Sequence, residues 1–258
     1  MSDADRTVLV LLDRPAAAPA QLAAATWLTR LLGGARLAAL AVRVPAVASI
    51  MPTEEVLTAE RQTAWDAAEQ ARLAALRQAC ATAPAVDLRV ADGSLAERIA
   101  TEGRHGDYLV VARPERGDSA GSRAICHAAL FATGRPVLVV PAAFSAAFGR
   151  RIAVAFRADG RAEQAVLAAL PLLRRAERID LFGEAAMPEL LIEQGIAATP
   201  CALPPGDFGT QLLAAMAETG DDLLVMGAYT RSAWREALLG GVTRHVLNEA
   251  VVPVLMQH

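Results

Sequence analysis

The chain contains no lysine, and all 25 of its basic residues are arginine. A P-loop needs a lysine ammonium at the β- and γ-phosphates of a nucleotide, so this route to nucleotide binding is excluded. Lysine Schiff-base chemistry and kinase-type catalysis are excluded for the same reason.

Other scarcities narrow the class of protein further. Aromatic residues make up only 4% of the chain against 54% hydrophobic residues, which predicts a core of Ala, Val and Leu. A net charge of −3 offers no basic surface to nucleic acid or to an anionic membrane. The sequence has no unbroken apolar run of about 18 residues, so no membrane span is expected. The acidic amino-terminal segment lacks the features of a signal peptide, and we expect a cytoplasmic location.

Cysteine and histidine are sparse and scattered. The cysteines are Cys80, Cys126 and Cys201, without CxxC spacing, which predicts reduced, buried thiols rather than disulfides or a zinc site. The four histidines have no partners at metal-ligand spacing, and no GxSxG nucleophile elbow occurs. We therefore expect neither catalytic residues nor a metal site.

The chain carries an internal repeat. Three strand-like segments recur in the same order: 6–14 with 150–158, 106–114 with 221–229, and 134–142 with the closing residues 251–258. Helical patterns alternate with these apolar runs, which is typical of parallel sheets buried on both faces. The sequence predicts an α/β protein of two tandem doubly wound domains, residues 1–143 and 150–258. Each is expected to hold a five-stranded parallel sheet, with residues 141–149 as the linker.

Glycines and capping residues set the expected ends of the helices. Gly33 and Gly34 end a helix over 18–32, and Gly220 ends one over 208–218. Ser94 and Asp207 are the expected amino-terminal caps of the helices that follow them. A long helix is predicted over 53–80, with Glu54 and Glu55 in its first turn. Shorter helices are predicted over 94–102, 162–175 and 187–194, and the second half has no counterpart of the long one.

The last 37 residues hold the most informative motif. An apolar strand ends at Gly227, a loop of small residues follows, and a helical segment after Gly240 and Gly241 leads to a final strand. Backbone N–H groups of a glycine-rich turn and a helix amino terminus together form a concave site for anions. The motif therefore predicts an anion or nucleotide at the carboxyl end of this strand.

The spacing Gly227-x2-Thr230-x9-Gly240-Gly241 resembles the universal stress protein family, whose nucleotide-binding members show G-x2-G-x9-G-[ST]. With the duplication, the chain is similar to tandem bacterial members, which implies an adenine nucleotide alpha hydrolase-like fold. In that family adenine and ribose lie over the carboxyl end of the first strand, and the triphosphate rests in the loop after the fourth. The resemblance implies an ATP site comprising Ala155, Phe156, Arg157, Gly227, Thr230, Gly240, Gly241, Val242 and Thr243.

Three of these positions depart from the family pattern. Thr230 replaces the second glycine, and Gly241 replaces a Ser or Thr hydroxyl. Arg157 replaces an acidic residue or Asn, where its guanidinium either pairs with a phosphate or blocks the ribose contacts. The first half has no GxxG, and Pro114 removes a backbone donor, so its site is expected to be degenerate. Arg113 and Arg116 there are expected to be solvated loop charges.

The sequence leaves several functions open. The leading hypothesis is a nucleotide-responsive stress or regulatory protein that binds ATP in its second half. The alternative is an interaction scaffold of the same fold that binds no nucleotide. An adenylate-forming ligase is less favoured, because no HIGH-like, KMSKS-like or SGGxD-like segment occurs. The closing strands, 136–140 and 253–256, are expected to pair with each other as an intrachain pseudo-dimer or with a second copy in a homodimer.

Overall fold

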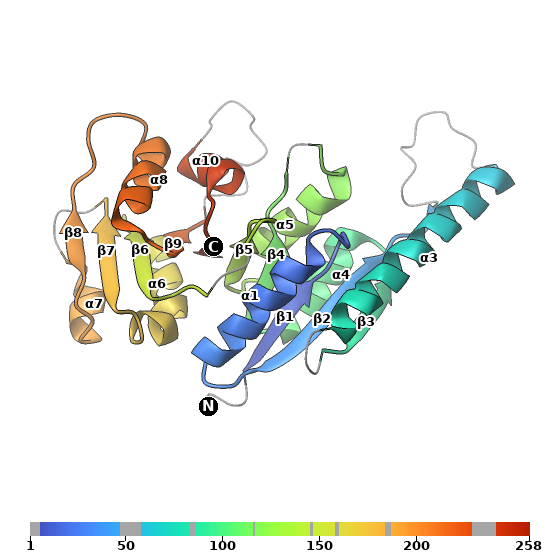
Figure 1. Cartoon of the computed structure of the whole chain (residues 1–258), viewed down its shortest axis with the longest axis horizontal. Helices are drawn as coiled ribbons and strands as arrows, with labels where there is room; N and C mark the ends of the chain where they lie inside the picture. The colour runs from blue at the N-terminus through green and yellow to red at the C-terminus, as the bar shows by residue number, and fades with distance from the viewer. Residues whose placement is uncertain are drawn as a thin grey trace.

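The computed structural model describes residues 6–46, 58–82, 86–115, 117–144, 147–157, 160–183, 187–228 and 241–258. Strands and helices alternate along the chain (Figure 1). The elements of the first half are β1 (Thr7–Leu11), α1 (Ala18–Leu31), β2 (Arg36–Arg43), α3 (Ala59–Ala81), β3 (Leu88–Asp92), α4 (Leu95–Glu102), η2 (Gly103–His105), β4 (Tyr108–Ala112), α5 (Ala120–Ala132) and β5 (Val137–Val140). Those of the second half are β6 (Arg151–Ala155), α6 (Gly160–Leu173), β7 (Arg178–Phe182), α7 (Glu189–Glu193), β8 (Thr199–Cys201), α8 (Phe208–Thr219), β9 (Leu223–Gly227), α10 (Val242–Glu249) and β10 (Val254–Gln257).

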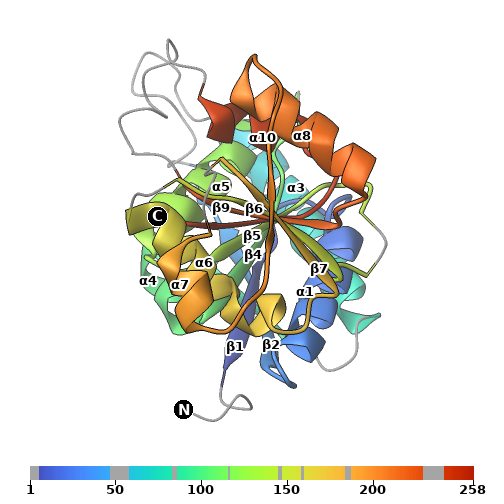
Figure 2. The same cartoon turned by 90° about the vertical axis from the view of Figure 1, so that its left-hand side faces the viewer.

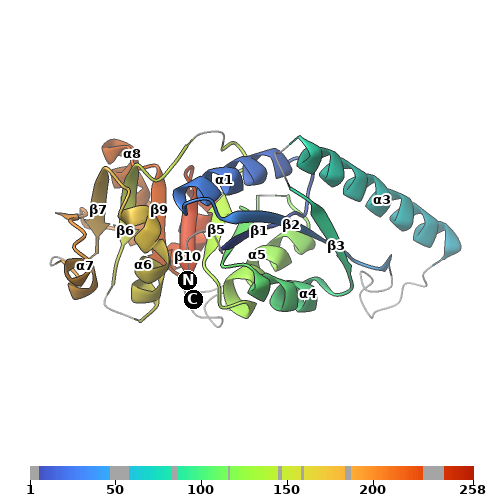
Figure 3. The same cartoon turned by 90° about the horizontal axis from the view of Figure 1, so that it is seen from below.

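The strands form one ten-stranded sheet in the order β3-β2-β1-β4-β5-β10-β9-β6-β7-β8. Within each half the strands are parallel, and the order of the second half mirrors that of the first. The predicted α/β doubly wound class is confirmed. β5 and β10 pair antiparallel and join the two five-stranded units edge to edge, which confirms the intrachain pairing, one of the two pairings expected for the closing strands (Figure 3).

The junction between the halves pairs two strands that would otherwise be exposed edges of a sheet. Leu138 lies opposite Leu255, and all four residues of β5 are buried. An unpaired edge leaves a row of N–H and C=O groups exposed, so pairing the two edges within one chain removes that liability. Tyr108 adds a contact across the halves, because its hydroxyl donates a hydrogen bond to the carbonyl oxygen of Ala168 on α6.

Helices cover both faces of the sheet. The core on one face is formed with α1, α3, α6 and α7, and the core on the other with α4, α5, α8 and α10. Seen end-on, α8 and α10 lie on one side of β6 and β9, and α6 and α7 on the other (Figure 2). Successive residues of a strand point to opposite faces, so Val8 enters the first core and Leu9 the second. This double burial explains why the strands are continuous apolar runs.

Capping residues and glycines mark most of the helix ends. Asp207 caps α8 by accepting a hydrogen bond from the Thr210 N–H at 2.9 Å, and Gly220 ends that helix at a φ of 71°. Ser94 occupies the cap position of α4, but its side chain makes no capping hydrogen bond, contrary to expectation. The long helix begins at Ala59 after the cap Thr58, later than the predicted Thr53. Residues 53–57, including Glu54 and Glu55, lie outside the described part of the chain.

The segment between the halves packs into the core. Phe148 is fully buried, its ring meets that of Phe144 edge-on, and its carbonyl oxygen accepts a hydrogen bond from the Trp27 indole at 2.8 Å. No helix in the described ranges is long and apolar enough to cross a membrane.

Candidate functional site

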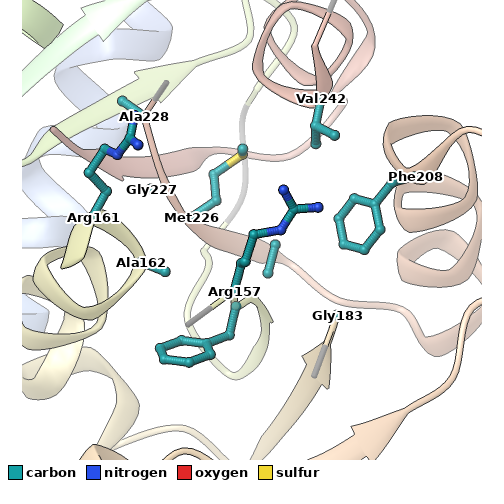
Figure 4. Close-up of a pocket in the computed structure, with 11 residues that line it drawn as sticks. Arg157, Arg161, Ala162, Gly183, Phe208, Met226, Gly227, Ala228 and Val242 are labelled. Carbon is teal, nitrogen blue, oxygen red and sulfur yellow. The ribbon is translucent and has the colours of Figure 1, made fainter. Parts of the chain in front are cut away.

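A hollow of about 160 Å³ lies at the carboxyl ends of β6, β7 and β9 (Figure 4). The carboxyl ends of parallel strands are where ligands bind in doubly wound sheets. Eleven residues line it: Ala155, Phe156, Arg157, Arg161, Ala162, Gly183, Phe208, Met226, Gly227, Ala228 and Val242. They come from three strand ends and from the amino-terminal turns of α6, α8 and α10.

The fold brings five of the nine predicted site residues to this hollow. Ala155, Phe156 and Arg157 enter it from the end of β6, Gly227 from the end of β9, and Val242 from the first turn of α10. Two further predicted residues, Thr230 and Gly240, lie outside the described residues.

The remaining two predicted residues lie at the start of α10 but do not line the hollow. Gly241 is the amino-terminal cap of the helix, in extended backbone with a φ of −73°. Thr243 is only 3% exposed, and its Oγ1 has no hydrogen-bond partner in the part of the chain that the structure describes. The first hydrogen bond of the helix runs from the Arg244 N–H to the Gly241 carbonyl oxygen, so the N–H groups of Val242 and Thr243 precede it.

Two glycines let backbone segments approach one another closely around the hollow. A Cβ on Gly227 would lie 3.0 Å from the Ala162 backbone nitrogen, so the end of β9 sits directly against the first turn of α6. Gly227 has no positive φ, and close approach alone explains the glycine here. Gly183, which follows β7, has a φ of +111°, and a Cβ there would lie 2.4 Å from the Phe156 carbonyl oxygen.

Among the described residues, two charged side chains line the hollow, and both are arginines. The Arg157 guanidinium extends from the end of β6 between Phe208 and Met226, toward Val242 at the start of α10 (Figure 4). Within the described residues, Arg157 makes no hydrogen bond or ion pair. Arg161 reaches the same hollow from α6 on the side of Ala228. A guanidinium facing a helix amino terminus leaves a region that favours an anion.

Six lining residues were not singled out from the sequence: Arg161, Ala162, Gly183, Phe208, Met226 and Ala228. Met226 and Ala228 flank Gly227, so their position next to the motif glycine could have indicated from the sequence that they line the hollow. Gly183 ends a predicted strand on the same edge of the sheet, and this position could have indicated it. Phe208 carries no such signal, because only the packing of α8 against the sheet places it there.

The corresponding region of the first half contains ion pairs. The Arg14 guanidinium bonds Asp13 at 3.1 Å and Asp118 at 2.7 Å, and also donates to the Arg113 carbonyl oxygen. Arg113 is not a solvated loop charge as predicted. It is partly buried, and its Nη1 donates to the carbonyl oxygen of Ala250, just after α10. Arg116 lies outside the described residues.

Cysteines and histidines add no second chemistry to the hollow. Cys80 and Cys126 are buried free thiols as predicted, whereas Cys201 is partly exposed. His245 of α10 packs on Gly209 of α8, and His127 stacks near the Phe131 ring. No group of three or more His, Cys, Asp or Glu side chains arranged for a metal ion is found over the described ranges.

Comparison with known proteins finds a family match in the second half of the chain. The family model described as "Universal stress protein family" matches residues 159–258, which contain most of the hollow's lining. No curated protein sequence matches the chain significantly.

Solved structures share the fold over nearly the whole chain. A universal stress protein from Archaeoglobus fulgidus DSM 4304 superposes with a TM-score of 0.70 at 14% identity, covering 97% of this chain and 95% of that one. A functionally unknown protein from Pseudomonas aeruginosa PAO1 superposes with a TM-score of 0.53 at 16% identity, covering 99% and 93%. At these sequence identities the structural superpositions show a shared fold. The evidence for the family is the match to residues 159–258. Residues 159–258 thus match the universal stress protein family, and the chain as a whole shares the fold of the solved structures.

Proposed function

We propose that the second half binds an adenine nucleotide, with ATP as the leading candidate, and that the chain acts as a stress-response or regulatory protein rather than as an enzyme. The observation that carries this proposal is the convergence of Arg157, Gly227 and the amino terminus of α10 on one hollow. The family match over residues 159–258 supports the same reading.

The chemistry divides between an apolar and a cationic side. Phe156, Met226 and Phe208 offer apolar surface to a base, and Arg157 faces the start of α10. A phosphate between them accepts hydrogen bonds from the guanidinium and from the Val242 N–H. Arg157 thus takes the phosphate-pairing role, one of the two roles that the sequence left open for it. Gly227 keeps the end of β9 close to α6 and leaves the hollow free of a side chain.

The scaffold alternative has one observation in its favour. Ligand pockets usually measure about 300–1,000 Å³, and the hollow described measures about 160 Å³. A second hollow, lined by the loop from Pro200 to Gly206, shares Gly183 and Phe208 with the first. We infer that a nucleoside extends into this neighbouring space, whereas a scaffold would leave both empty.

Calorimetric titration with ATP separates the two functions. We expect micromolar binding by the wild-type chain, and none by Gly227→Glu, because its side chain would fill the hollow with a negative charge. Arg157→Gln should weaken binding by about tenfold to a hundredfold, the usual effect of losing a charge-assisted hydrogen bond. Arg174→Gln is the matched control, since Arg174 lies just beyond the far end of α6 and bonds Gln194. Absence of binding by the wild-type chain at millimolar ATP would support the scaffold.

We further propose a cytoplasmic location and no nucleic-acid partner. Because the β5 and β10 edges pair within the chain, a homodimer would need another surface. Light scattering of the purified chain tests this: a monomer mass is expected, and a dimer mass would point to such a surface.

A further inference from the structure

Two aspartates are buried in the second half, away from the hollow. Asp180 lies in the middle of β7 and has no exposed surface, and Asp221 joins α8 to β9 with 5% exposure. The two carboxyls lie within hydrogen-bonding reach of each other. Two ionised carboxylates at such a distance in an apolar interior repel each other and lose their hydration, so one of them tends to keep its proton.

Asp180 is the member of the pair that contacts a guanidinium. Arg178 on the same strand lies 2.8 Å from Asp180 through Nε and Oδ2, and donates from Nη2 to Oδ1 at 2.9 Å. The Cys201 thiol of β8 lies 3.5 Å from Oδ1. Asp221 has no such ion pair within the described ranges, and its Oδ2 accepts a hydrogen bond from the Thr219 hydroxyl.

Asp221 Oδ1 is buried and has no hydrogen-bond partner among the described residues, whereas Asp180 Oδ2 lies 2.8 Å from the Arg178 Nε. Buried polar atoms in native proteins are nearly always satisfied, so the unpartnered oxygen of Asp221 needs an explanation. A proton on Asp221 Oδ1, donated to the neighbouring carboxyl of Asp180, satisfies this atom.

We propose that Asp221 and Asp180 hold one proton between them, and that its release loosens α8 and the start of β9. The pair thereby makes the second half sensitive to pH. The proposal does not depend on nucleotide binding. It assigns a proton-binding function to residues that the candidate site does not use.

The direction of the effect follows from the surroundings of Asp221. Burial and, after it, the neighbouring Asp180 carboxyl together raise the pKa of the Asp221 carboxyl to about 6, although the hydrogen bond from Thr219 and the charge of Arg178 lower it. Arg151 of β6 also lies nearby, against Gly220. Because the pKa is higher in the folded than in the unfolded chain, the stabilisation is complete below pH 4. It is lost as the pH rises through about 6.

The pair is a feature of the second half alone. The strand registers place Asp180 at the position of Ala38 in the first half, since Ala153 and Leu9 are equivalent residues of β6 and β1. The same registers place Asp221 at the position of Gly106. The neighbouring acids Asp107 and Asp222 are common to both halves, where each accepts a hydrogen bond from backbone N–H at the start of its first strand. The first half therefore serves as an internal control.

The location of the pair connects it to the candidate site. Asp221 follows α8 directly, while Phe208 at the other end of that helix lines the hollow. A helix that loosens at its carboxyl end has weaker support for the side chain at its amino end. The pair is thus placed to couple proton release to the shape of the hollow.

Carboxyl carbon NMR of the aspartate-labelled, full-length protein tests the proposal directly. We expect one aspartate to titrate near pH 6, and its signal to be absent from Asp221→Asn. Hydrogen exchange should show α8 losing protection as the pH rises from 5 to 7.5, after correction for the intrinsic rates, by up to roughly tenfold, because pH 5 lies about one unit below the pKa of about 6. Amides of α4 and α5 in the first half should show no such loss.

Substitutions separate the proton from the packing. Asp221→Asn keeps a hydrogen-bond donor toward Asp180, so α8 should stay protected at both pH values. Asp180→Ala with Asp221→Gly reproduces the first half and should also remove the pH dependence. The proposal is overturned if every aspartate of the wild-type chain titrates below pH 5. It is equally overturned if α8 protection in the wild type does not change between the two pH values. The wild-type measurements decide the matter even if a variant fails to fold.

Discussion

Gly183→Ala tests the close backbone approach that shapes the hollow. At a φ of +111° an L side chain is strained, and we expect a cost of about 1–3 kcal/mol for the backbone alone. The new Cβ would also lie 2.4 Å from the Phe156 carbonyl oxygen, which is backbone and has little freedom to move. Overpacking of this kind adds about 1–3 kcal/mol.

Gly195→Ala is the matched control in the same half. Gly195 has a φ of +65°, but nothing lies within 4 Å of the position its Cβ would take. We expect about 1–2 kcal/mol from the left-handed backbone and no steric contribution. The excess for Gly183→Ala over this control should therefore be about 2 kcal/mol.

Urea unfolding followed by circular dichroism measures this difference. With a denaturant dependence of about 1–3 kcal/mol per molar urea, the midpoint of Gly183→Ala should fall about 1 M below that of Gly195→Ala. ATP affinity should fall in the first variant only, because Gly183 lines the hollow and Gly195 does not. Equal midpoints for the two variants would refute the claim that the backbone of β6 closes tightly on Gly183.

Further predictions concern packing, capping and thiol chemistry. Phe148→Ala should lower the free energy of unfolding by about 3–5 kcal/mol in a urea titration, since the ring is fully buried. Asp207→Ala should lower the thermal midpoint because it removes a capping hydrogen bond, whereas Ser94→Ala, at a cap position without one, should leave it unchanged. Under native conditions a thiol reagent should label Cys201 before Cys126, because Cys126 is fully buried and burial raises the pKa of its thiol to about 12. Mass spectrometry of the labelled peptides checks the order, and early labelling of Cys126 would contradict it.

The acid pair shows a limit of sequence reasoning. Asp221 and Asp222 are adjacent in the chain, and nothing in their sequence distinguishes them. In the fold, Asp222 accepts a hydrogen bond from the Gly149 backbone at 2.7 Å, as its counterpart Asp107 does from Thr7. Asp221 turns inward to Asp180 instead. Only the register between β6 and β7 brings Asp180 to that side.

The sequence by itself determined the α/β class, the repeat and the helix ends marked by Asp207 and Gly220, because periodicity and capping are local properties of the chain. It also pointed to five lining residues of the hollow, since strand ends in a doubly wound sheet meet at one edge. Only the tertiary structure decided that the two units share one sheet, that Arg14 pairs with Asp13 and Asp118 in the first half, and that Gly183 and Phe208 line the hollow of the second. These features depend on contacts between segments far apart in the chain, and no local pattern encodes such distances.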